Sequence, residues 1–455
     1  RGLSNTFGAS NFSSPSANLD GLSYTFDYAN ARFMLLDQFT PIDGKASDGS
    51  TYSAGTAIAT QQSWISSRLS SKPADSHAFV FSHKQLIGGN HTDTLFGSAS
   101  SNPTQQNAFM SSLDAADVGY LFTGHDHMHN RSVITSPDGA STVNQVIAAS
   151  NSYKFYTPGS LSSHGTDTVG PNAGQLSKNR ETEISQELYS IGYYIVTVDG
   201  PRVNVDFYSA DPDPSTPGLV DLDLTSTPTL NFSKRETFGY SLNGKRFLVP
   251  SGGDLSVVQD SFGSTSVRLA GTNTAVEHDY NNRPLFKDIN TGWTPRSGEL
   301  FSDLLTLWGT QDFGQFGESA APFTLTLSYV APAGYSGPVS IVRVNDDGSM
   351  TSLGGVVNGN GTISVTAFGD GNYAVAVPEP VAPSMLLLAG AAALRRRRPQ
   401  KSSSTRNQLS LPKEHPIRVF TIGLGVLSLT VSANAATLVL QQGLNGYSGA
   451  RDTEL

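Results

Sequence analysis

F-V-F-S-H-K (residues 79–84) and L-F-T-G-H-D-H (residues 121–127) are two short, mainly apolar segments that each run into histidine. Such runs are typical of buried strands. In open α/β sheets, ligands collect at the carboxyl ends of the strands, so the two segments predict one shared site. Gly124 permits a tight exit from its strand, which lets His125 and His127 point into that site.

The sequence from residue 19 to residue 210 alternates predicted strands and helices around these two segments. Helices are expected at Thr56–Ser70 and Gln105–Ala115, where apolar residues recur at helical spacing. The expected strands are Tyr24–Asp27, Arg32–Leu36, Ala78–Ser82, Val118–Thr123, Tyr189–Val198 and Arg202–Ser209. D-G-P (residues 199–201) separates the last two strands and is a hairpin signal. The mixture favours layered α/β packing for residues 1–210.

The sequence changes character after a Pro-rich linker at residues 211–228, which begins with D-P-D-P-S-T-P. Residues 229–376 hold many short Val, Leu and Thr runs that are separated by Gly, Asn and Asp. The clearest expected strands are Phe323–Val330, Val339–Val344 and Thr362–Ala367. This pattern predicts an all-β, sandwich-like domain.

The composition excludes some classes of function. The net charge is −9 and no broad basic face precedes residue 390, so nucleic-acid binding is not expected. The chain has no cysteine, so disulfides and thiolate metal sites are impossible. Any metal ion must therefore sit on His, Asp, Glu or Asn.

The ordered pair S-H-K (residues 82–84) and G-H-D-H (residues 124–127) resembles the calcineurin-like metallophosphoesterase family over roughly residues 19–210. F-M-L-L-D (residues 33–37) and Q-Q-S-W-I (residues 61–65) also stand where that family has a strand and a helix. The resemblance implies a four-layer α-β-β-α fold for the front domain. It also implies hydrolysis of phosphoesters by two bridged divalent ions that activate water for attack at phosphorus. Ligands of nitrogen and oxygen suit Fe, Mn or Zn.

The resemblance assigns metal ligands residue by residue. His83 and His125 would bind one ion, and His127 would bind its partner. Three further residues are candidates for contact with the phosphoester substrate. They are His91 in a Gly-rich loop, His129 in the continued alternation H-D-H-M-H, and Arg131.

The family's first three motifs, Asp-x-His, Gly-Asp-x-x-Asp and Gly-Asn-His-Asp/Glu, do not occur in the right context before Ser82. D-S-H (residues 75–77) and G-N-H-T (residues 89–92) match two of them by letters but not by position. We therefore expect the bridging carboxylate and the catalytic residues upstream of Arg1. On this interpretation the domain is N-terminally truncated, and the fragment itself is expected to be inactive.

The tail contains V-P-E-P (residues 377–380), an apolar run at Met385–Leu394 and four arginines at Arg395–Arg398. Ten apolar residues are too few to span a bilayer comfortably, because a helix needs about 20. Residues 377–398 resemble a PEP-CTERM sorting signal. This implies export to the bacterial surface, transient anchoring in the membrane, and processing by an exosortase-type protease.

Residues 399–455 are expected to be the fused start of another exported protein. A signal peptide is predicted at about residues 413–435, with Lys413 and Arg418 in its basic region and A-N-A (residues 433–435) as its cleavage site. Signal peptides belong at N-termini, so this segment suggests a joined reading frame.

A second class of function stays open. The chain would then be a non-catalytic surface or adhesion protein whose phosphoesterase domain is degenerate. An enzyme requires the three carboxylate-bearing motifs in order, whereas a relic would carry them in degraded form.

Overall fold

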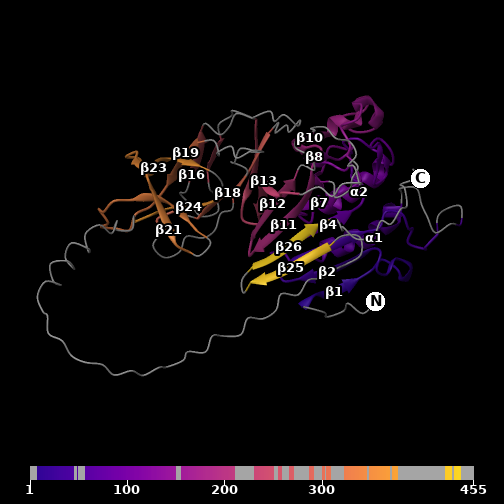
Figure 1. The fold of residues 1–455 in the computed structure, drawn as a ribbon, viewed down its shortest axis with the longest axis horizontal. Coiled ribbons are helices and arrows are strands. Elements are labelled where there is room, and N and C mark those ends of the chain that lie inside the picture. The colour runs from indigo at the N-terminus through magenta and orange to yellow at the C-terminus, as the bar shows by residue number, and fades with distance from the viewer. Residues whose placement is uncertain are drawn as a thin grey trace, which may run out of the picture.

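The structure of the protein is a computed structural model. It describes residues 8–45, 49, 57–149, 155–210, 230–250, 255–258, 266–270, 286–291, 300–302, 304–308, 322–345, 348–368, 371–377, 426–432 and 435–441. A mixed α/β part precedes an all-β part along the chain, drawn in indigo to magenta and in orange in Figure 1. Both coarse assignments agree with the sequence-based expectation.

The first sheet is mixed and has eight strands. They are β1 (Ser10–Ser13), β2 (Tyr24–Tyr28), β3 (Ala31–Leu36), β4 (His77–Ser82), β7 (Tyr120–Thr123), β8 (His129–Thr135), β9 (Thr142–Ile147) and β10 (Glu181–Glu187). Their spatial order is β1-β2-β3-β4-β7-β9-β8-β10. The four strands β3, β4, β7 and β9 are parallel, with Phe81 opposite Phe122. The carboxyl ends of β4 and β7 therefore lie side by side, as the histidine-ended segments predict.

The second sheet is antiparallel, in the order β13-β12-β11-β26-β25. Its strands are β11 (Ile191–Asp199), β12 (Arg202–Ala210), β13 (Ser233–Ser241), β25 (Val426–Ser432) and β26 (Ala435–Gln441). The predicted hairpin is present, since β11 pairs with β12 along its whole length. β13 follows the expected linker at residues 211–228 but pairs with β12, so the first part extends beyond the predicted boundary at residue 229.

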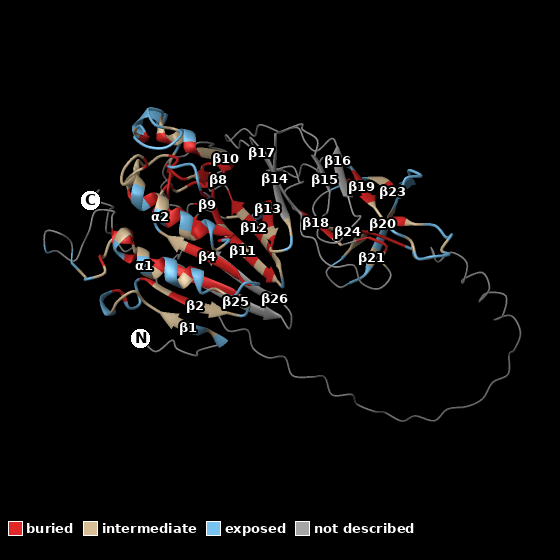
Figure 2. Ribbon diagram, turned by 180° about the vertical axis from the view of Figure 1, so that it is seen from behind, coloured by how far each residue is buried: buried red, intermediate tan, exposed pale blue. Residues whose placement is uncertain are grey.

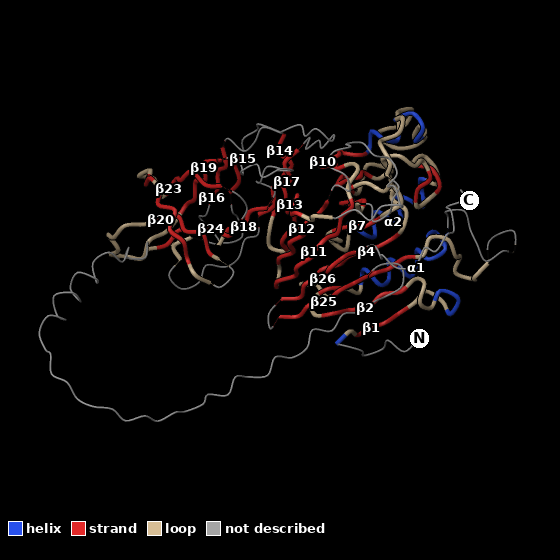
Figure 3. The backbone as a smooth tube through the Cα atoms, in the orientation of Figure 1, coloured by secondary structure: helices blue, strands red, loops and turns tan. Residues whose placement is uncertain are grey.

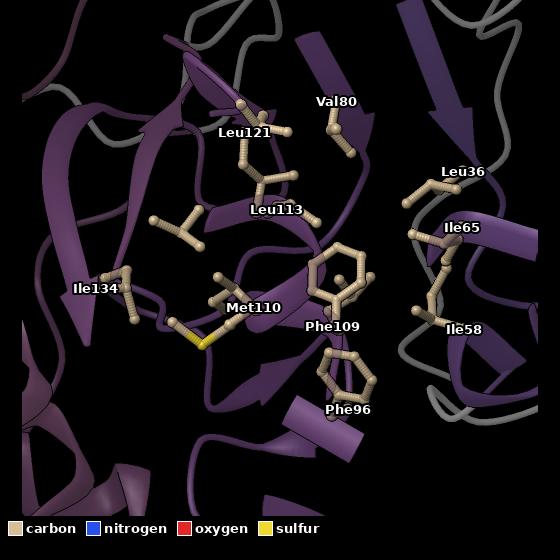
Figure 4. Close-up of a cluster of buried hydrophobic side chains, with 14 of the residues drawn as sticks. Leu36, Ile58, Ile65, Val80, Phe96, Phe109, Met110, Leu113, Leu121 and Ile134 are labelled. Carbon is tan, nitrogen blue, oxygen red and sulfur yellow. The ribbon is translucent and has the colours of Figure 1, made fainter. Parts of the chain in front are cut away.

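Two α-helices are described, α1 (Ala57–Ser70) and α2 (Pro103–Asp114), close to the predicted bounds. Both pack on the first sheet, where Ile65 and Phe109 meet Val80 and Leu121 (Figure 4). The other face of that sheet packs against β11, β12 and β13. The buried residues of this second interface include Phe33, Phe79, Phe122, Tyr194, Val196, Val205 and Phe207. Figure 2 shows these facing strands as largely buried. The described residues thus give a helix layer and two sheet layers.

The all-β part consists of two sheets, seen as red strands in Figure 3. The strands of one sheet are, in spatial order, β14 (Lys245–Pro250), β17 (Phe286–Thr291), β18 (Leu305–Trp308), β24 (Gly371–Ala376), β20 (Ser340–Val344) and β21 (Met350–Gly354). The strands of the other sheet are β15 (Leu255–Val258), β16 (Ser266–Ala270), β19 (Pro322–Ser328), β23 (Thr362–Phe368) and β22 (Val356–Val357). Leu305 and Leu307 of the first sheet share one core with Leu325, Leu327 and Ile363 of the second. Two sheets with a shared core match the expected sandwich-like arrangement.

Most of the tail falls outside the described residues. Of the expected sorting signal at residues 377–398, only Val377 is described. The strands β25 and β26 overlap the end of the expected signal peptide and form a hairpin beside β11, from Tyr194 opposite Leu440 to Val198 opposite Ala436. The origin of residues 399–455 in another protein stays a prediction. Within the described ranges, no helix is long and apolar enough to cross a membrane.

The side chain of His77 links the start of β4 to the second sheet through two hydrogen bonds. Its Nε2–H donates to the carbonyl of Gly200 at 2.8 Å, so its Nδ1 accepts from the hydroxyl of Tyr240 at 3.0 Å. The imidazole is fully buried and, with this pair of partners, neutral. Burial lowers the pKa of His77 below its ordinary value of 6.5, and nearby Lys72 adds to that shift.

Protein stability should fall as the pH drops below about 6.5, because the unfolded chain then binds a proton that folded His77 resists. Each such histidine contributes a slope of up to about 1.4 kcal/mol per pH unit, which ends at the lowered pKa of the folded state. Burial also lowers the pKa of His164, which adds to the wild-type slope. Urea unfolding at pH 7.5 and pH 5.5 should show a smaller loss in His77→Gln than in the wild type. Equal losses in both proteins would contradict this role for His77.

Candidate functional site

Four histidines and two other aromatic side chains form a continuous row beyond the ends of β4 and β7. We call this set the histidine row. The distances between neighbouring ring centroids are 6.4 Å for Phe39–His83, 5.1 Å for His83–His125, 4.1 Å for His125–His91, 4.5 Å for His91–Tyr156 and 5.0 Å for Tyr156–His127. The structure therefore brings His83 and His125 together as predicted, and adds His91 directly beside them. His127 lies at the other side of Tyr156.

The turn that carries His125 and His127 has an unusual backbone. Both residues have positive φ angles, 72° and 38°, which residues other than glycine seldom adopt. Such conformations cost about 1–3 kcal/mol each and persist only where the surroundings impose them. Here the amide of Gly124 donates to the carbonyl of His83 at 2.9 Å, which joins the two strand ends. Backbone strain of this kind is concentrated at functional sites.

Asp126 holds this turn against the loop at Gly88–His91. Its carboxylate is fully buried and accepts hydrogen bonds from the amides of Gly89 (2.5 Å), Asn90 (3.1 Å) and His91 (2.8 Å). A Cβ atom on Gly88 would lie 2.8 Å from Oδ2 of Asp126, so glycine is needed for this close approach. Burial raises the pKa of Asp126. The hydrogen bonds from the His91 side chain and from these amides lower it by more than that, so that the net pKa is below the usual range.

His91 receives its orientation from the same carboxylate. Its Nδ1–H donates to Oδ1 of Asp126 at 2.6 Å, and its ring is about one quarter exposed. This hydrogen bond fixes the ring orientation and places the proton of the neutral imidazole on Nδ1, so that Nε2 faces the site as the nitrogen that can take up or release a second proton. The sequence suggested substrate contact for His91 but treated G-N-H-T as a chance match that lacks its acid. The structure does place a carboxylate on His91, but this carboxylate belongs to Asp126 of G-H-D-H and not to a residue next to G-N-H.

Asp93 is a site residue that the sequence analysis missed. It opens the short ribbon of β5 (Asp93–Thr94) and β6 (Gly97–Ser98). Its Oδ1 lies 3.0 Å from Nε2 of His125, and its Oδ2 lies 2.5 Å from Nζ of Lys84. The hydrogen bond with His125, and then the one with Lys84, hold the pKa of Asp93 well below its usual range despite its partial burial. No periodicity in the sequence marks this two-residue strand.

His129 and Arg131 lie elsewhere, in the core between the two sheets. His129 contacts Glu236 through Nε2 at 2.9 Å and the hydroxyl of Tyr194 through Nδ1 at 2.6 Å. Arg131 donates from Nε to Glu236 at 2.8 Å, and its Nη2 also donates there. Both side chains are about 1% exposed, so this placement gives no support to the predicted contact with substrate. We call His129, Arg131, Tyr194 and Glu236 the Glu236 cluster.

In the Glu236 cluster, the negative charge of Glu236 is compensated by the positive charge of Arg131. Burial raises the pKa of Glu236, but the positive charge of Arg131 and the hydrogen bond with His129 lower it to about 2 overall. Ser185 adds a hydrogen bond to the same carboxylate at 3.1 Å. The partners come from β8 and β10 of the first sheet and from β11 and β13 of the second, so the cluster fixes how the two sheets face each other.

The described residues contain no group of three or more His, Asp or Glu side chains arranged to hold a metal ion. His83 and His125 still lie next to each other, with the Asp93 carboxylate on His125. These donors suit one ion that accepts nitrogen and oxygen ligands.

Comparisons with protein-family models, with curated proteins and with solved structures found no match to this chain. The functional conclusion therefore depends on the residues of the site and on the fold that positions them.

Proposed function

We propose that the chain is part of an exported, metal-dependent phosphoester hydrolase of the calcineurin-like metallophosphoesterase kind. The observation that carries the proposal is the convergence of His83, His91 and His125 at adjacent strand ends, with His91 held by buried Asp126. In open α/β sheets, ligands bind beyond the carboxyl ends of the strands, which is where these histidines gather. The strained turn at His125 and His127 supports the same conclusion.

Each residue of the row has a proposed role. His83 and His125 hold one divalent ion and His127 holds its partner, with Fe, Mn or Zn as suitable metals. Two such ions, when bound, supply the activated water and stabilise charge on the phosphoryl oxygens. The Nδ1–H of His91 is bound to Asp126, so Nε2 is the nitrogen through which His91 exchanges a proton with the substrate.

The reaction is a hydrolysis in which water adds to phosphorus and the bond to the leaving oxygen breaks. Protonated His91 donates the proton on Nε2 to that oxygen, and the proton released by water returns to Nε2, while the Nδ1–H stays bound to Asp126. A positioned histidine of this kind typically contributes about 10²–10⁴-fold to a rate. Lys84 lies at the other end of the row and provides positive charge near the phosphate, although it already pairs with Asp93.

The proposal extends to fold and location. A helix layer and two sheet layers support a four-layer α-β-β-α arrangement for the complete domain. The resemblance of residues 377–398 to a PEP-CTERM signal supports export to the bacterial surface and processing by an exosortase-type protease.

Phosphate binding tests this function, because a phosphoester hydrolase must also bind the phosphate it releases. We expect the full chain to bind inorganic phosphate in the presence of Mn²⁺ in a calorimetric titration. His125→Ala and His91→Ala should each weaken binding by roughly 10- to 100-fold, because the first removes a proposed metal ligand and the second a proposed hydrogen bond to the charged phosphate. His77→Gln changes a histidine at the opposite end of β4 and should leave phosphate affinity unchanged.

The second candidate function is a non-catalytic surface or adhesion protein with a degenerate phosphoesterase domain. The lack of a three-ligand group among the described residues favours it. Phosphate binding that is absent, or equal in the wild type and in His125→Ala, would reject the enzyme proposal and support this alternative.

A further inference from the structure

Tyr156 is the one non-histidine ring inside the histidine row. Its ring meets the His91 ring at 4.5 Å with an interplanar angle of 81°, and the His127 ring at 5.0 Å and 49°. Phe155, its neighbour in sequence, is fully buried, whereas Tyr156 is only partly buried. The ring of Tyr156 therefore belongs to the wall of the site and not to the core below it.

Two hydrogen bonds set the position of Tyr156. The amide of Gly159 donates to the carbonyl of Gly89 at 2.9 Å, and Nδ2 of Asn90 donates to the carbonyl of Thr157 at 2.7 Å. Both bonds join the segment around Tyr156 to the loop that Asp126 holds. Because His91 belongs to that loop, the Tyr156 ring and the His91 ring are placed by one connected set of contacts.

A second aromatic side chain, Phe39, stands at the far end of the row. The amide of His83 donates to Oε1 of Gln38 at 3.1 Å, which fixes the loop of Phe39 beside the end of β4. The Lys84 ammonium lies 5.5 Å from the Phe39 ring centroid, within the range of a cation–π contact. Phe39 thus stands at the end of the row beside His83, whereas Tyr156 stands between His91 and His127.

We propose that the substrate is a phosphoester of an aromatic or heteroaromatic alcohol, and that Tyr156 contacts the ring of that alcohol. The inference rests on the proposed function, in which His91 protonates the leaving oxygen. The leaving group must then lie beside His91, whose ring has the proposed metal ligand His125 on one side and the Tyr156 ring as its other aromatic neighbour. Aromatic pairs in offset or edge-to-face contact are favoured by about 0.5–1.5 kcal/mol beyond their area burial, which corresponds to roughly twofold to tenfold in affinity.

The test compares two phosphate esters that differ in the alcohol. Calorimetric titrations with Mn²⁺ measure the binding of phenyl phosphate and of ethyl phosphate to the full chain. The ratio of the affinity for phenyl phosphate to the affinity for ethyl phosphate is the quantity to compare. We expect this ratio to be roughly twofold to tenfold larger in the wild type than in Tyr156→Leu. Tyr156→Phe should keep the wild-type ratio. Tyr193→Leu alters a tyrosine that stacks on Tyr208 in the second sheet, and should also keep the ratio.

Ethyl phosphate is the internal control, since its unchanged affinity shows that Tyr156→Leu still folds and binds the phosphate group. The inference is overturned alone if both esters bind but the ratio in Tyr156→Leu equals that of the wild type. It is overturned together with the proposed function if neither ester binds to the wild type. A loss of the phenyl preference in Tyr156→Leu, restored in Tyr156→Phe, supports it.

Discussion

Replacing Glu236 with alanine should lower the free energy of unfolding by about 3–5 kcal/mol, the usual cost of removing one partner from a buried ion pair. The carboxylate is about 2% exposed and accepts hydrogen bonds from His129, Arg131 and Ser185. Without it, the Arg131 guanidinium keeps its charge in a site that water does not reach. The contact of Arg131 with the Phe238 ring, at 4.1 Å, is too weak to offset that cost.

Lys234→Ala provides a matched control on the same strand. Lys234 is 44% exposed and its Nζ lies 3.5 Å from Asp206, so the loss of this surface pair should cost only about 0.2–1 kcal/mol. Chemical denaturation at pH 7 measures both variants against the wild type. A destabilisation in Glu236→Ala no larger than that in Lys234→Ala would contradict the proposed charge balance of the Glu236 cluster.

The Glu236 cluster also bears on the site. His129 is the first residue of β8 and follows His127 by two positions. Glu236 and Tyr194 fix the position of His129, and this restricts the conformations that the preceding turn can adopt. The cluster therefore helps to hold His127 in its strained conformation, although it does not contact the histidine row.

The location of the site could be predicted from the sequence because local patterns mark the strands that carry its histidines. Two apolar runs that end in S-H-K and G-H-D-H become neighbouring parallel strands, so His83 and His125 meet at one sheet edge. The helices α1 and α2 were predictable for the same reason, since the spacing of their apolar residues is local.

Other features depend on contacts between distant segments, which no local pattern records. The carboxylate partner of His91 is 35 positions away at Asp126, so the letters G-N-H-T could not reveal it. The alternation in H-D-H-M-H suggested that His129 faces the site. The strand β8 begins at that residue, however, and its side chain enters the core between the sheets. The membership of β13 in the second sheet likewise depends on pairing across the linker.

Residues 1–455 should hold at most one tightly bound divalent ion. Two +2 charges about 3.5 Å apart repel each other by ~19 kcal/mol at an effective dielectric constant of about 20. Neutral imidazoles cannot offset that repulsion, so a bridging carboxylate is required. The carboxylate in contact with the row at His125 is Asp93, and it is already paired with Lys84.

Mass-spectrometric metal analysis of the full chain, loaded with Mn²⁺ and then desalted, should give no more than one ion per chain. His83→Ala and His125→Ala should lose that ion, because their rings are neighbours at 5.1 Å. His127→Ala should retain it, since Tyr156 stands between His127 and the other histidines. Two tightly bound ions per chain, of which one disappears in His127→Ala, would show that a carboxylate of this chain does bridge them. The site would then be complete within residues 1–455, and the expectation of a missing carboxylate would be wrong.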